Sequence, residues 1–154
     1  MRSFKDRNGQ EWSLTVDVGA IKRARTLAGF DLLSVLDDDL APLAKLSDDF
    51  VLLVDVIYSV CKPQADSRGV SDEQFGEGLV GDPICDAQGV LLAELADFFP
   101  RPEQRAAMRK VLAKVEQTTT AVLKRIDSET ARIDELDVDQ LAKSAIEQSI
   151  GSPA

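Results

Sequence analysis

Apolar and polar residues alternate near the N-terminus, with the turn-forming pair Asn8-Gly9 in the middle of the alternation. A two-residue loop would leave Phe4 and Trp12 on opposite faces, whereas a three-residue loop beginning at Arg7 sets them directly opposite each other. We predict a β-hairpin with the longer loop, packed on helices or paired with another chain, since an isolated hairpin is only marginally stable. The face that we expect to be buried comprises Phe4, Trp12, Leu14 and Val16.

From Asp17 onward, the apolar residues recur every three or four positions, which is typical of amphipathic helices. Asp17 is a predicted N-cap, and Gly29 a predicted C-terminal stop, of the first helix. The central helix is apolar on most of its circumference, and we predict that Ser47 caps it and Pro63 ends it. Such a helix is buried in its own domain or partly covered by another subunit. Its polar residues fall on one narrow stripe: Asp48, Asp55, Ser59 and Lys62.

The region after Pro63 contains further helix signals. Residues 64–70 are polar and predict a link, and Ser71 with Gln74 forms the capping-box pattern of a short helix. Asp82 and Pro83 predict the N-cap and first position of the next helix, which ends before Pro100. Three glycines weaken the short helix and mark a candidate mobile region: Gly76, Gly78 and Gly81.

Beyond Glu103, apolar residues follow one narrow stripe along a long, charged helix. Ile133 and Leu136 extend this stripe, and a new start signal at Asp137 predicts a last helix through Leu141, Ala145 and Ile146, before a frayed end. The stripe either faces the protein's own core, as most amphipathic stripes do, or offers a surface for a partner's helix. The candidate partner-binding residues are Val111, Val115, Val122 and Ile126.

Together these patterns predict a mainly α fold, with an N-terminal β-hairpin packed on a bundle of about six helices and with long C-terminal helices. We expect residues 1–100 to form the hairpin and helical core domain. Residues 101–150 are expected to form the C-terminal amphipathic helices, in the same domain or as an arm. The chain has 154 residues, of which 44% are hydrophobic, and this suffices for one domain with one core.

The net charge and the composition of the chain exclude several kinds of partner and of catalytic or metal site. The net charge is −9, so phosphate backbones and anionic lipids are repelled, and we expect neither nucleic acid nor membrane as a partner. Histidine is absent, which removes the commonest general base and metal ligand. Cys61 and Cys85 cannot complete a zinc site alone, and we expect both to be buried in a reducing cytosol. The acidic run 37–39 lacks calcium-loop spacing. We therefore predict no enzyme activity, no metal and no cofactor.

One basic cluster lies on the first predicted helix and comprises Lys22, Arg23 and Arg25. Such a cluster is either a solvated helix face or a docking patch for an acidic segment of a partner. Because the chain as a whole is acidic, the partner that its composition favours is a basic or amphipathic protein surface.

Several stretches of the chain resemble the tail assembly chaperones of long-tailed bacteriophages. One stretch combines the hairpin residues Phe4, Asn8-Gly9 and Trp12 with the run Val16 to Arg23. Others are Val51 to Tyr58 continuing through Cys61-Lys62-Pro63-Gln64-Ala65, then Gly69 to Phe75, and finally Leu91 to Pro100. The resemblance covers about the first hundred residues, and it is one of layout, without catalytic signatures.

The resemblance implies a function in the cytoplasm of an infected bacterium. Such proteins coat the tape measure protein and keep it soluble while tail tube subunits polymerise around it, and they are usually absent from the virion. It implies the tape measure protein as partner, with the tail tube protein and copies of the chain itself as further candidates. Two alternatives stay open: a structural tail or neck component of the virion, and an acidic inhibitor that sequesters another protein.

Overall fold

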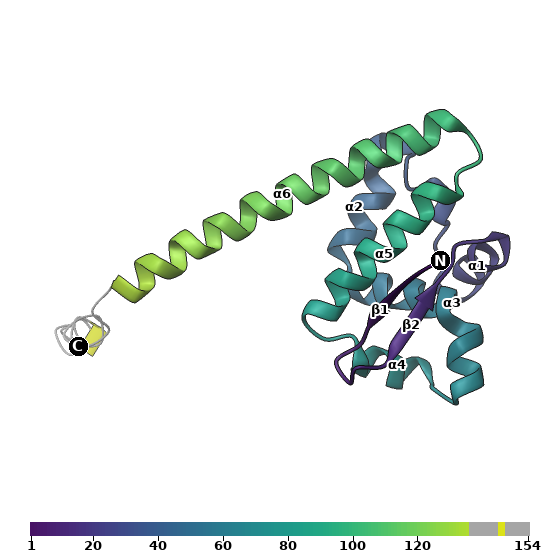
Figure 1. Ribbon diagram of the computed structural model, residues 1–154, viewed down its shortest axis with the longest axis horizontal. Coiled ribbons are helices and arrows are strands. Elements are labelled where there is room, and N and C mark those ends of the chain that lie inside the picture. Colours follow the sequence, from purple (N-terminus) through teal and green to yellow (C-terminus); the bar gives the residue numbers. More distant parts are fainter. Residues whose placement is uncertain (136–144, 147–154) are drawn as a thin grey trace, which may run out of the picture. The chain divides into compact units, whose positions relative to one another are not determined.

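The computed structural model describes residues 1–135 and 145–146, and the chain forms two compact units, Met1–Leu112 and Ala113–Ala154. The described part is mainly helical, with one antiparallel hairpin at the N-terminus and a long helix toward the C-terminus, which confirms the predicted fold class. The elements are β1 (Arg2–Lys5), β2 (Glu11–Leu14), α1 (Val18–Arg23), η1 (Ala24–Ala28), η2 (Leu32–Ser34), η3 (Asp38–Leu40), α2 (Ala41–Asp48), α3 (Phe50–Arg68), α4 (Asp72–Gly78), α5 (Asp82–Phe98) and α6 (Pro102–Glu135) (Figure 1).

The hairpin has the predicted register, with Phe4 paired to Trp12. The Asp6 carboxylate organises its loop, since Oδ1 accepts hydrogen bonds from the Asn8 and Gln10 amides and Oδ2 accepts one from Trp12 Nε1 at 3.1 Å. Gly9 has a φ of +78°, in the left-handed region that the three-residue loop requires. The predicted face is buried: Phe4, Trp12, Leu14 and Val16.

Within the first unit, α5 packs along β1 and α3 packs along β2 (Figure 1). Ser13 on β2 donates its amide to Gln64 Oε1 at 3.0 Å, and its carbonyl accepts from Gln64 Nε2, so the outer edge of the hairpin is tied to α3. Arg2 on β1 pairs with the buried Glu94 of α5 at 2.8 Å. The hairpin is therefore part of the core of this unit.

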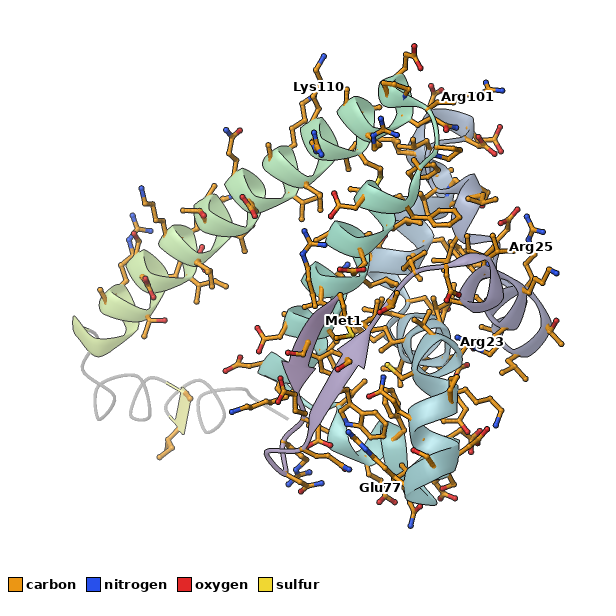
Figure 2. All side chains as sticks on the ribbon, turned by 45° about the vertical axis from the view of Figure 1, so that its right-hand side comes forward. Met1, Arg23, Arg25, Glu77, Arg101 and Lys110 are labelled. Atoms are coloured by element: carbon orange, nitrogen blue, oxygen red, sulfur yellow. The ribbon has the colours of Figure 1, made fainter. Side chains whose placement is uncertain are left out.

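The predictions that Pro63 ends the central helix and that residues 64–70 form a link are wrong, because α3 continues to Arg68. Proline has no N–H, so the carbonyl four residues earlier, that of Ser59, loses its helical donor. Arg23 replaces this donor: Nε donates to Ser59 O at 2.8 Å and Nη2 to Val60 O at 3.1 Å. Figure 2 labels Arg23, whose side chain lies between α1 and α3.

Two predicted helix starts are also wrong, each by one or two residues. Asp49 caps α3 by accepting from the Leu52 amide at 3.1 Å, whereas Ser47 lies inside α2 and accepts from Gln88 Nε2 at 3.1 Å. The N-cap of α5 is Gly81, whose φ of +76° favours glycine, and Asp82 is the first helical residue. Asp82 lies within the first turn of α5, where the helix dipole favours it, whereas the first turn of α3 contains no acidic residue.

Other local predictions are confirmed. Asp17 Oδ1 accepts from the Ala20 amide at 2.7 Å, and Gly29 ends the first helical segment with a φ of +63°, after five π-helical residues in η1. Ser71 and Gln74 form the capping box at the start of α4. These signals depend only on neighbouring residues, so the sequence carries them in full.

The prediction that both cysteines are buried holds for only one of them. Cys61 is buried, and burial raises the pKa of its thiol to about 12, whereas Cys85 is exposed on α5.

The predicted polar stripe of α3 is partly buried and partly exposed. Ser59 is 1% exposed and donates to Asp55 O, while Asp55 itself is exposed.

The predicted last helix lies largely outside the described residues. Of its residues, only Ala145 and Ile146 are described, and both are helical.

Candidate functional site

The predicted partner-binding stripe follows α6 and changes its surroundings along the helix. Val111, in the first unit, is half-buried and packs on the core near the fully buried Met108. In the second unit, Val115 is 42% exposed, Val122 48% and Ile126 51%. The structure therefore places three of the four predicted residues in one exposed apolar row on one face of the helix.

The prediction missed Leu123, which is 55% exposed and lies beside Val122. It falls outside the seven-residue repeat of the stripe, so a search for one narrow face passes over it. We call Val115, Val122, Leu123 and Ile126 the α6 row.

A second exposed apolar feature lies in the first unit, where α3, α4 and the start of α5 enclose a groove of about 400 Å³. Leu79 is 3% exposed and forms the floor, while Phe50 and Val51, 55% and 74% exposed, stand at the α3 side. Gly76 lines the groove from α4 without a side chain, and a Cβ there would lie at an ordinary contact distance of 4.0 Å from Val54 Cγ1. The groove is lined by Phe50, Val51, Val54, Asp55, Asp72, Glu73, Gly76, Leu79 and Ile84.

The rim of this groove is acidic. Asp55 faces it from α3, and Asp72 and Glu73 face it from α4; the described residues that line the groove include no lysine or arginine. Partial burial, together with the neighbouring carboxylates Asp72 and Asp49, raises the pKa of Asp55. Within the described residues, none of these carboxylates forms an ion pair. The groove thus joins an apolar interior to uncompensated negative charge.

One sequence signal pointed to this surface. The central helix is apolar nearly all round, and only part of that circumference is buried: Leu53 and Ile57 face the core, while Phe50 and Val51 do not. The pattern of α3 alone could not show which part would be left uncovered, because the covering elements lie elsewhere in the sequence.

The predicted basic cluster, with Lys22 and Arg23 in α1 and Arg25 in η1, is divided between two roles. Arg23 donates to α3 carbonyls, Arg25 pairs with Asp31 at 3.1 Å, and Lys22 is exposed. Arg23 is therefore a structural residue, and the docking-patch interpretation keeps only the two remaining cations.

The described residues contain no group of three His, Cys, Asp or Glu side chains placed to hold a metal ion. Among the described helices, none combines the length and the apolar character needed to cross a membrane. Comparison with protein-family models, with curated proteins and with solved structures finds no match to this chain. The arguments about function below therefore depend on the two exposed apolar surfaces.

Proposed function

We propose that this chain is a tail assembly chaperone of a long-tailed bacteriophage, acting in the host bacterial cytoplasm. It binds apolar helical faces of the tape measure protein and keeps that protein soluble while the tail tube assembles. The α6 row carries the proposal: exposed apolar side chains at helical spacing, on an acidic chain, suit an amphipathic helix of another protein.

Two properties of the chain, its exposed apolar row and its net negative charge, suit such a chaperone. A long helical protein exposes apolar faces that aggregate unless another apolar surface covers them. The surplus negative charge of this chain keeps the resulting complex soluble and disfavours binding to nucleic acid. The tail tube protein and further copies of the chain are secondary candidates for contact.

The test is co-expression with a tape measure protein, the long helical partner that this proposal requires, measured as the soluble yield of that protein. The double variant Val115→Glu/Val122→Glu should reduce the yield to that of the tape measure protein alone. Gln117→Glu/Ala121→Glu is the matched control, because both residues are exposed on the opposite face of α6. It should behave as the wild type.

Circular dichroism and denaturation separate the two interpretations of the stripe. If Val115→Glu/Val122→Glu unfolds the protein, the row serves the chain's own core and the proposal fails. If the variant folds and the yield is unchanged, the α6 row is not the binding surface. Stoichiometric copies of the chain in purified virions would favour the structural tail or neck component, and binding that collapses with added salt would favour the acidic inhibitor.

A further inference from the structure

The groove between α3 and α4 is a separate surface from the α6 row, and its chemistry is specific. Its interior is apolar, with Leu79 at the floor and Val54 and Ile84 half-buried at the sides. Its rim carries Asp55, Asp72 and Glu73, without a compensating cation from the described residues that line it. An occupant must therefore bring both apolar side chains and positive charge.

We propose that this groove binds an amphipathic helix of a partner protein whose apolar face is flanked by lysine or arginine. Phe50 and Val51 supply apolar contact area that no described element of the chain buries. Cations flanking the apolar face of the incoming helix would reach the carboxylates of Asp55 and Asp72. The inference concerns a surface other than the α6 row and holds whichever protein supplies the helix.

Charge decides between the candidate occupants. A second copy of this acidic chain meets the groove with like net charge, whereas a basic helix relieves the repulsion between neighbouring carboxylates. The raised pKa of Asp55, caused by partial burial and by Asp72 and Asp49, is consistent with a site whose charge is compensated only on binding.

The probe is a fluorescein-labelled amphipathic peptide of about 18 residues, or five turns, with leucines on one face and lysines and arginines beside them. Its counterpart carries glutamate at every cationic position. Fluorescence anisotropy with the full chain should give at least about tenfold tighter binding of the cationic peptide. Added salt should weaken that binding, and Asp55→Asn/Asp72→Asn should weaken it and flatten the salt dependence.

Gly76→Leu is the decisive variant, because it fills the groove from α4 at a helical position where a Cβ meets only ordinary contact distance. It should weaken the binding of the cationic peptide by at least about tenfold. Gly89→Leu is the matched control, since Gly89 is a helical glycine with open space around its Cβ position. It should leave the affinity within about twofold of the wild type.

Further variants test the groove independently of Gly76→Leu and separate it from the α6 row. If Gly76→Leu does not fold, Val51→Asp tests the α3 side of the groove against Val18→Asp, an exposed valine on another helix. Val115→Glu/Val122→Glu should retain peptide binding, which separates this inference from the proposed function.

Three results would overturn the inference. The first is equal binding of the two peptides by the wild type. The second is undiminished binding by a folded Gly76→Leu or Val51→Asp variant. The third is a wild-type dimer, seen in sedimentation without peptide, that Gly76→Leu dissociates, because a second copy would then be the occupant of the groove.

Discussion

Met108 and Val115 lie two turns apart on the same face of α6, yet their environments differ. Met108 is fully buried in the core of the first unit, and Val115 is 42% exposed in the second. Both residues are apolar, and both fit the same stripe. Helical spacing thus identifies residues that share a face, while the presence of a covering element decides what that face does.

The comparison extends to the two units. In Met1–Leu112, apolar side chains from the hairpin and from helices α1 to α6 meet in one core, and their burial stabilises the fold by roughly 25 cal/mol per Å² of apolar surface. In the described part of the second unit, the apolar side chains of the α6 row remain exposed. Substitutions in the row should therefore affect binding, and substitutions in the core should affect folding.

The largest change in the free energy of unfolding is expected from Trp12→Ala. Trp12 is 1% exposed, contacts Phe75 with ring centroids 4.8 Å apart, and donates to Asp6. Its removal should lower the free energy of unfolding by about 3–5 kcal/mol, measured by urea denaturation. Ile126→Ala in the α6 row should change it by less than about 0.5 kcal/mol. Equal losses from the two variants would remove the distinction between core and row.

An intermediate change in the free energy of unfolding is expected where Arg23 donates to the carbonyl that Pro63 leaves without a helical donor. Arg23→Met leaves the carbonyl of Ser59 without a donor and removes an additional hydrogen bond to Val60 O, and it should cost about 1–3 kcal/mol of unfolding free energy. Pro63→Ala restores an N–H that reaches the Ser59 carbonyl. In the Pro63→Ala background, Arg23→Met should therefore cost less by about 1 kcal/mol. An additive double-mutant cycle would contradict this account.

The smallest change in the free energy of unfolding is expected at Asp55, which lines the exposed groove of the first unit. Because the folded-state pKa is raised, the ionised carboxylate disfavours folding above that pKa, and the penalty disappears as pH falls below the unfolded value of about 3.9. Asp55→Asn should therefore increase stability at pH 7, by less than about 0.5 kcal/mol since the group is exposed to screening solvent. The gain should vanish in acid; a loss at pH 7 would show that the carboxylate is already compensated.

The sequence predicted those features whose physical cause lies within a few residues. The Phe4–Trp12 register follows from a loop that needs a left-handed residue at Gly9, and the caps at Asp17 and Ser71 follow from side chains that reach nearby amides. The candidate site was predicted in part, because the spacing of Val115, Val122 and Ile126 is local and their exposure is not.

Other features depend on contacts between segments that are distant in the sequence. Where α3 continues through Pro63, the donor to the Ser59 carbonyl is Arg23, which is 36 residues away in the sequence, and no local rule for proline includes such a donor. The groove exists because α4 packs beside α3, with Gly76 at the α4 side and the exposed residues Phe50 and Val51 at the α3 side. Local patterns therefore predict a mainly helical chain and the residues that share a helix face. The packing of distant segments sets where α3 ends and which faces are buried or exposed, because burial depends on every segment that can reach the surface.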